Sequence, residues 1–277
     1  MPLTRAFILS AVLLMTSTAH ASDQPLVMAH RGGLGHWPEN TILGFHKALE
    51  QNVDVLEIDV WRTKDNVVVV NHDRTVDRTT DGSGRVADFT LKELQALDAG
   101  YRWSLDGAFP YRGAGHVIPT LDQVFTEFPE ARVNIDIKEN SDELINGVCQ
   151  SIEKHNAHDT VIVASFHQSV LPRVRERCPG VVTSAGFWET ARFLVLSWFR
   201  LTWLYKPPFA AFQVPVKLGF LPVVTPTFVR AAHGLGVEVH PWTINDPEVM
   251  RRLIDMGVDG IITDYPDRLW KVLDTEE

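Results

Sequence analysis

A chain of 277 residues, 45% of them hydrophobic, is long enough to bury a large core in one α/β domain or in two small ones. This composition excludes a disordered or fibrous protein. The formal net charge of −9 makes nucleic-acid binding by the whole chain a poor fit, whereas an excess of acidic residues suits a protein that places carboxylates around a cation.

The first 21 residues have the pattern of an export signal. Arg5 supplies the positive charge, residues 6–15 are apolar, and residues 19–21 (Ala-His-Ala) match a small-residue cleavage site. The apolar run is shorter than the about 20 residues that a membrane-spanning helix needs; a retained amphipathic anchor is the alternative. We expect residues 1–21 to be a signal peptide and residues 22–277 to form the mature domain of a periplasmic or secreted protein.

Cys149 and Cys178 are the only cysteines in the sequence, so at most one intramolecular disulfide can form. Export makes such a bond permissible. Both cysteines fall in segments with a helical pattern, however, and we expect them to be two buried free thiols.

Apolar runs and amphipathic stretches alternate along the mature chain. The runs predict strands at residues 26–30, 55–60, 67–72, 132–138, 160–165, 180–185, 210–215, 237–243 and 260–263. The stretches predict helices at residues 40–51, 120–128, 142–156, 168–177, 226–234 and 246–256. Repeated strand-then-helix units of this length indicate a parallel sheet with helices outside it.

The predicted fold is a (β/α)₈ barrel (TIM barrel), for which about 250 residues is the usual size. Nine strand candidates compete for its eight places, and we expect residues 210–215 to be the extra piece. A doubly wound open sheet is the alternative, but no dinucleotide-type glycine fingerprint follows the first strand.

Two predicted insertions interrupt the alternation. Residues 74–118 are rich in glycine, arginine and aspartate and form a small insert after the third strand. Residues 187–224, near the sixth strand, form an aromatic-rich insertion in which basic residues outnumber the single acid, Glu189. Its tryptophans and basic residues are Trp188, Trp198, Trp203, Arg192, Arg200, Lys206 and Lys217.

Four predicted strands end in polar side chains, and in a barrel these ends meet at one mouth. The side chains are His30 and Arg31, Glu57 and Asp59, His72 and Asp73, and Asp136 and Lys138. Residues two apart on a strand point the same way, so Glu57, Asp59 and Asp136 would share one space. Three carboxylates there would repel one another unless a cation lies among them, and oxygen ligands favour Mg²⁺ or Ca²⁺.

Two histidines at the same mouth, His30 and His72, could exchange protons near neutral pH. Arg31 and Lys138 add positive charge suited to a phosphate. Together these groups predict phosphoryl-transfer chemistry, and no serine or cysteine nucleophile motif competes. We assign four other histidines to the surface or to supporting positions: His36, His46, His116 and His240.

Several long motifs resemble the glycerophosphodiester phosphodiesterase family over essentially the whole mature chain. They are "HRGGLGHWPENT", "LEIDVWRTKDNVVVVNHD", "RTTDGSGRVADFTLKELQALDAG", "IPTLDQVF", "NIDIK" and "PWTINDPEVMRRLIDMGVDGIITDYPD". The resemblance implies a (β/α)₈ barrel with a small insert at residues 74–118. It also implies cation-dependent hydrolysis of small-molecule glycerophosphodiesters to sn-glycerol 3-phosphate and an alcohol.

The resemblance also assigns roles to individual residues. His30 and His72 match the acid–base pair, Arg31 a phosphate ligand, and Glu57 and Asp59 metal ligands. Asp136, in "NIDIK", stands where the family usually has glutamate, so this third metal ligand reaches one methylene less far.

Two further positions belong to the substrate side of the predicted pocket. Lys138 keeps a phosphate-binding or charge-stabilising place, and Trp242 walls the glycerol or alcohol side, with burial in the barrel core as its alternative. Such enzymes resemble the phosphatidylinositol-specific phospholipases C. The attacking oxygen is either the glycerol 2-hydroxyl, which gives a cyclic phosphate, or water.

Residues 193–205 form an apolar stretch too short to span a bilayer but suited to a membrane interface. With "NIDIK", this stretch looks like the subgroup that hydrolyses lysophospholipids to lysophosphatidic acid, a lysophospholipase D activity. The alternative is a helix buried against the barrel. A barrel that binds lipids without catalysis is a further alternative, which the presence of both histidines disfavours.

Overall fold

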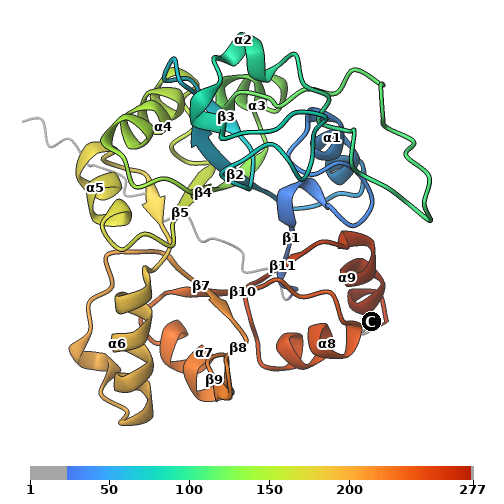
Figure 1. Cartoon of the computed structure of the whole chain (residues 1–277). Coiled ribbons are helices and arrows are strands. Elements are labelled where there is room, and N and C mark those ends of the chain that lie inside the picture. The colour runs from blue at the N-terminus through green and yellow to red at the C-terminus, as the bar shows by residue number, and fades with distance from the viewer. Residues whose placement is uncertain (1–23, 276–277) are drawn as a thin grey trace, which may run out of the picture.

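The computed structural model describes residues 24–275, and the predicted signal peptide therefore lies outside the described residues. Within that range a ring of parallel strands is surrounded by helices (Figure 1). In ring order the strands are β1 (Leu26–Ala29), β2 (Val55–Arg62), β4 (Arg132–Ile137), β5 (Val161–Ala164), β6 (Val182–Thr183), β7 (Ala211–Pro215), β10 (Glu238–Trp242) and β11 (Gly260–Thr263).

Backbone hydrogen bonds close the ring. The strands from β11 through β1 to β6 form one continuous sheet, and β7 pairs in parallel with β10. At the two remaining junctions Ala185 N donates to Ala211 O at 2.8 Å and Ile244 N donates to Ile262 O at 2.9 Å. The predicted (β/α)₈ barrel is confirmed.

Two strand assignments need correction. Residues 210–215, expected to be the extra piece, contain barrel strand β7. The run at 67–72 instead contributes β3 (Val68–Val70), which pairs antiparallel with β2. Only residues 63–67 connect β2 to β3, and this connection is too short for a parallel crossover, which needs a dozen residues or more.

A helix precedes or follows every barrel strand and covers its outer side (Figure 1). These helices are α1 (Ile42–Glu50), α3 (Leu121–Glu127), α4 (Asp142–Lys154), α5 (Val170–Arg177), α6 (Phe187–Trp198), α7 (Pro226–His233), α8 (Pro247–Asp255) and α9 (Pro266–Leu273). Several begin where a Ser, Thr or Asp side chain accepts a hydrogen bond from the first turn, as Thr41 does for α1 and Asp246 for α8. Helix α9 was not predicted, and α6 includes part of the 193–205 stretch for which a helix against the barrel was the alternative.

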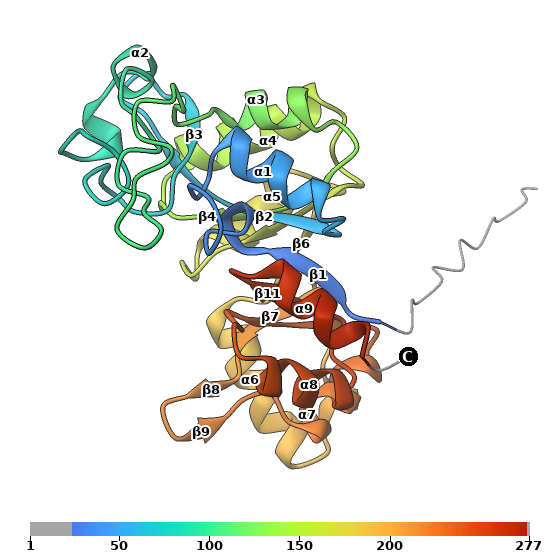
Figure 2. The same cartoon turned by 90° about the vertical axis from the view of Figure 1, so that its right-hand side faces the viewer.

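The insert at 74–118 contains η2 (Val86–Asp88) and α2 (Leu91–Leu94) and has a small core of its own. The aromatic-rich stretch at 187–224 contains helix α6 and strand β7 of the barrel. Its additions to the barrel are η3 (Thr202–Leu204) and a hairpin of β8 (Lys217–Leu218) and β9 (Leu221–Pro222). The hairpin and the insert project on the same side of the barrel (Figure 2).

Cys149 and Cys178 form a disulfide between α4 and the end of α5, with their Cα atoms 5.4 Å apart. The prediction of two free thiols was wrong, because neighbouring helices of the barrel bring the two residues side by side. Within residues 24–275 no helix has the length and apolar character needed to cross a membrane.

Candidate active site

A pocket with a cavity of about 250 Å³ opens at the carboxyl ends of the barrel strands. All eight site residues predicted from the sequence line this pocket, although they span more than two hundred positions of the chain. They are His30, Arg31, Glu57, Asp59, His72, Asp136, Lys138 and Trp242. Their placement follows from the parallel ring, which brings distant strand ends to one mouth.

The turn after β1 positions the first histidine and the arginine. Arg31 has a left-handed backbone (φ 52°), and Gly32 and Gly33 continue it with φ of 80° and 86°. A Cβ on Gly32 would lie 2.8 Å from the Phe45 ring, so only glycine fits. This tight turn aims the Arg31 backbone N–H at Glu57, whose Oε2 accepts it at 2.9 Å.

Lys138 lies between two buried carboxylates. Its Nζ is 2.8 Å from Asp59 Oδ1 and 2.6 Å from Asp136 Oδ2. The other oxygen of Asp59 accepts a hydrogen bond from Asn40 Nδ2 at 2.9 Å, and Arg31 Nε lies 3.4 Å away from it. Asp136 Oδ1 is buried and has no hydrogen-bond partner.

The buried charges shift one another's pKa values. Burial and the neighbouring Asp59 raise the pKa of Glu57 to about 7. Burial also raises the pKa of Asp136. Burial acts in the same direction on Asp59, but Lys138 and Arg31 outweigh it and lower the pKa of this carboxyl. The pocket therefore holds more acidic groups than its own cations neutralise.

His72 reaches the pocket by the β2–β3 hairpin and not at the end of a barrel strand. Strand β3 runs back along the projecting end of β2, and Asn71 N donates to Asp59 O at 2.9 Å. His72 Nδ1 then lies 2.6 Å from Asp73 Oδ1. The sequence prediction placed His72 at the pocket correctly, but through an incorrect strand assignment.

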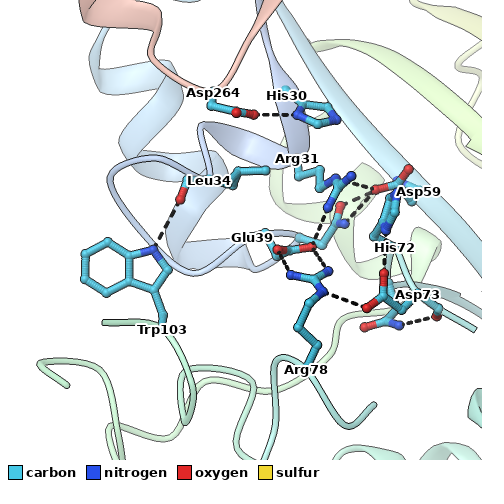
Figure 3. A network of polar contacts seen from close by, with 12 residues as sticks. His30, Arg31, Leu34, Glu39, Asp59, His72, Asp73, Arg78, Trp103 and Asp264 are labelled. Atoms are coloured by element: carbon cyan, nitrogen blue, oxygen red, sulfur yellow. Dashed lines mark hydrogen bonds and ion pairs between the residues drawn. The ribbon is translucent and has the colours of Figure 1, made fainter. Parts of the chain in front are cut away.

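Each histidine uses Nδ1 to contact a carboxylate, and Figure 3 shows both pairs. His30 Nδ1 is 2.5 Å from Asp264 Oδ1, and Asn245 Nδ2 donates to the other oxygen of Asp264 at 2.6 Å. A carboxylate at Nδ1 fixes the ring and its tautomer, so Nε2 is available to a substrate.

The two histidines have pKa values shifted in opposite directions. Burial acts to lower the pKa of His30, but the hydrogen bond to Asp264 and the charge of Glu57 outweigh it, and the pKa is raised. Burial lowers the pKa of His72, assisted by the positive charge of Arg31. Two titratable groups with opposite shifts are the arrangement expected of an acid and a base.

A network of carboxylates and guanidinium groups connects Arg31 with Asp73, the partner of His72 (Figure 3). Glu39 accepts hydrogen bonds from Arg31 at 3.1 Å and from both terminal nitrogens of Arg78 at 2.6 and 2.8 Å. Arg78, which belongs to the insert, also donates to Asp73 at 2.6 Å. The insert is therefore linked through Glu39 to Arg31 and directly to Asp73, the partner of His72.

Aromatic side chains form one wall of the mouth. Trp242 lines the pocket and packs edge-on against Phe166, with ring centroids 5.4 Å apart. It also packs against the small cluster of Met28, Val55 and Ile262, so it lies between the pocket and the barrel interior. Phe187, the first residue of α6, lines the pocket as well.

The four histidines assigned to other roles do not line the pocket. His36 pairs with Asp267 and His46 with Glu127. His116 packs against a tyrosine ring of the insert. His240 is buried in the barrel next to Glu238.

Sequence reasoning missed three charged residues of the network. Asp264 directly follows β11, so the rule that selected polar groups at strand ends could have found it. Glu39 lies in the motif "HWPENT", but only the folded chain shows its partners. Arg78 gave no signal, because nothing in the insert sequence tells which arginine turns toward the mouth.

The fold and the pocket define a (β/α)₈-barrel protein with two carboxylate-paired histidines, an arginine and a lysine at its mouth. The sequence profile of the glycerophosphoryl diester phosphodiesterase family matches residues 30–268, and the chain belongs to this family. A glycerophosphodiester phosphodiesterase from Caldanaerobacter subterraneus is 37% identical over 254 residues, which cover 88% of this chain and 96% of that protein.

A solved structure with a similar fold also belongs to a phosphodiesterase. A phosphodiesterase from Oleispira antarctica, in complex with the product sn-glycerol-3-phosphate, matches with a TM-score of 0.75 at 26% identity; the match covers 91% of this chain and 97% of the other. A more distant relative is a human lysophospholipase D, 27% identical over 263 residues, which cover 87% of this chain and 84% of that protein.

Proposed function

We propose that the protein hydrolyses glycerophosphodiesters to sn-glycerol 3-phosphate and an alcohol. One observation carries the proposal: two carboxylate-paired histidines, an arginine and a lysine line the same pocket as three buried carboxylates. Membership of the family and the product bound to the Oleispira structure support the choice of substrate.

In this proposal His72 is the base and His30 the acid. Asp73 accepts the Nδ1 proton of neutral His72, so its Nε2 lone pair can take a proton from the attacking oxygen. Protonated His30, held by Asp264, donates its Nε2 proton to the oxygen of the leaving alcohol. The attacking oxygen belongs to the glycerol 2-hydroxyl or to water, and detection of a cyclic phosphate distinguishes the two.

Arg31 and Lys138 bind the phosphate in this scheme. The Arg31 guanidinium is oriented by Glu39, and Lys138 is oriented by Asp59 and Asp136. Their positive charges offset the negative charge that builds on the phosphate oxygens during transfer. Phe166 and Trp242 would contact the alcohol or the glycerol carbon chain from the aromatic wall.

The same pocket suits one divalent cation, Mg²⁺ or Ca²⁺. Within residues 24–275 no group of three His, Cys, Asp or Glu side chains is already arranged to hold a metal, and the Lys138 ammonium occupies the space between two of the acids. The donor chemistry nevertheless fits: Asp136 Oδ1 is buried without a partner, and the pKa of Glu57 is raised to about 7.

We therefore assign Glu57, Asp59 and Asp136 as the residues that would hold the cation. Carboxylate oxygens are the ligands that both ions prefer. A bound cation would add positive charge beside the phosphate and so stabilise the transition state.

We also propose that the protein acts after export, in the periplasm or outside the cell. The signal-like pattern of residues 1–21 supports this location. The Cys149–Cys178 disulfide supports it as well, because such bonds persist in oxidising compartments.

The test is product formation from glycerophosphocholine by the protein spanning residues 22–277. We expect choline and sn-glycerol 3-phosphate to appear with Mg²⁺ or Ca²⁺ and to disappear with a chelator. His46→Ala is the matched control, because His46 pairs with Glu127 at the surface and should keep the wild-type rate. No release with any divalent cation would overturn the proposal.

A further inference from the structure

Helix α6 has two apolar faces, and only one of them is used by the fold. Phe193, Leu194 and Ser197 are buried, and the Phe193 ring packs against Phe212 and Phe228 with centroids 4.5 and 5.1 Å away. An ordinary barrel helix would present polar residues on its other side. Here the other side is mostly apolar, with Arg192 among its exposed residues.

The unused face continues into the segment after the helix. Its exposed residues, called the aromatic surface below, are Trp188, Val195, Trp198, Phe199, Leu201, Trp203 and Leu204. Trp203 is 72% exposed and Phe199 69%, so most of the surface of these residues faces solvent. A positive φ at Arg200 turns the chain, and Leu201 N donates to Leu196 O at 2.9 Å, which folds η3 back beside α6.

This region carries a net positive charge, whereas the whole chain carries a net negative charge. The chain as a whole carries −9, yet residues 190–237 contain no Asp or Glu and five basic residues: Arg192, Arg200, Lys206, Lys217 and Arg230. Glu189, just before this range, is paired with Arg175 at 2.7 Å. The segment that carries most of the exposed rings is therefore basic, in a chain that is acidic as a whole.

The aromatic surface begins at the rim of the pocket. Phe187 lines the pocket, and its ring packs edge-on against Trp188 with centroids 5.1 Å apart. The β8–β9 hairpin, with fully exposed Phe220 between its strands, projects on the side of the barrel where the insert with α2 also projects (Figure 2). The Trp188 end of the aromatic surface therefore lies next to the mouth, and the surface extends from there along α6 to η3.

We propose that the aromatic surface docks the protein on a membrane that contains anionic lipids. Aromatic rings combined with arginine and lysine are the side chains that bind the headgroup region. A second copy of the chain fits less well, because a symmetric contact would bring the same basic residues against each other. The consequence for catalysis, which rests on the proposed function, is that phosphodiesters of lipids held in that membrane can reach the pocket past Phe187.

Vesicle sedimentation tests the docking without any need for turnover. The probes are phosphatidylcholine vesicles with and without phosphatidylglycerol, and the protein spans residues 22–277. We expect binding to the anionic vesicles that weakens with salt, and quenching of tryptophan fluorescence by brominated lipid. A variant with Trp198→Ser, Phe199→Ser, Trp203→Ser and Leu204→Ser should bind about tenfold more weakly or worse.

Two further variants are a control elsewhere on the surface and a test of the basic residues. Leu105→Ser with Phe109→Ser removes exposed apolar residues from the insert and should leave binding unchanged. Arg192→Gln with Arg200→Gln should remove the preference for anionic vesicles. Hydrolysis of soluble glycerophosphocholine should be the same in all variants, because none of these residues lines the pocket.

Three outcomes would overturn the docking proposal. The first is that the wild type does not bind vesicles. The second is that the insert variant loses as much binding as the four-residue variant. The third is that the four-residue variant converts a wild-type dimer to a monomer but still binds vesicles. Absence of hydrolysis on every substrate, with the vesicle results as expected, would overturn the proposed function and leave the docking standing.

Discussion

Lys138→Met tests whether one ammonium neutralises the buried acids of the pocket. Methionine keeps the length of the side chain and removes the charge that lies 2.8 Å from Asp59 and 2.6 Å from Asp136. Removing one partner of a buried ion pair costs about 3–5 kcal/mol, because the remaining charge is left uncompensated. We expect the free energy of unfolding, measured by urea titration in the presence of a chelator, to fall by that amount near neutral pH.

The loss should depend on pH in a defined direction. Without the ammonium, the already raised pKa of Asp136 rises further, so the folded variant retains a proton that the unfolded chain releases. Stability of the variant then falls as pH rises above the ordinary aspartate pKa. The deficit relative to the wild type should be larger at about pH 8 than at about pH 5.

Lys271→Met is the matched control, because its pair with Asp267 is an exposed contact between positions four apart on α9. Such pairs contribute about 0–1 kcal/mol. A Lys138→Met loss no larger than that of the control, or a loss that does not change with pH, would refute the account of the pocket charges.

Two further predictions concern the acid and the disulfide. Asp264→Asn removes the larger of the two interactions that raise the pKa of His30, so this pKa should fall and the alkaline limb of the kcat/KM profile should move to lower pH. An unmoved limb would contradict the role of His30 as the acid. Cys149→Ser with Cys178→Ser opens a link between residues 29 positions apart, so the free energy of unfolding should fall by about 3–4 kcal/mol. The rate on soluble substrate should not change, and reduced wild type should match the variant; equal stability of all three would contradict a stabilising disulfide.

The candidate site could be predicted from the sequence because most of its polar side chains lie at or next to the carboxyl ends of strands. The spacing of Glu57 and Asp59 placed both side chains on one face, and the parallel ring brought Asp136 beside them. His72 was found although β3 is not a barrel strand, because the projecting end of β2 carries the hairpin back to the mouth.

Other features depend on packing that local patterns do not encode. The Cys149–Cys178 disulfide depends on how α4 and α5 lie beside each other. The Arg78 network depends on the path of an irregular insert. The composition of residues 193–205 predicted either a buried helix or an interfacial one, and the structure shows a buried face and an exposed apolar face in this segment.

The most direct measurement is the rate of sn-glycerol 3-phosphate release from glycerophosphocholine by His72→Ala. General acid–base catalysis contributes about 10²–10⁴ in rate, and the variant should lose a factor in this range while its unfolding transition stays close to that of the wild type. A folded His72→Ala protein with the wild-type rate would contradict the account, because the proposed base would then take no part in the reaction.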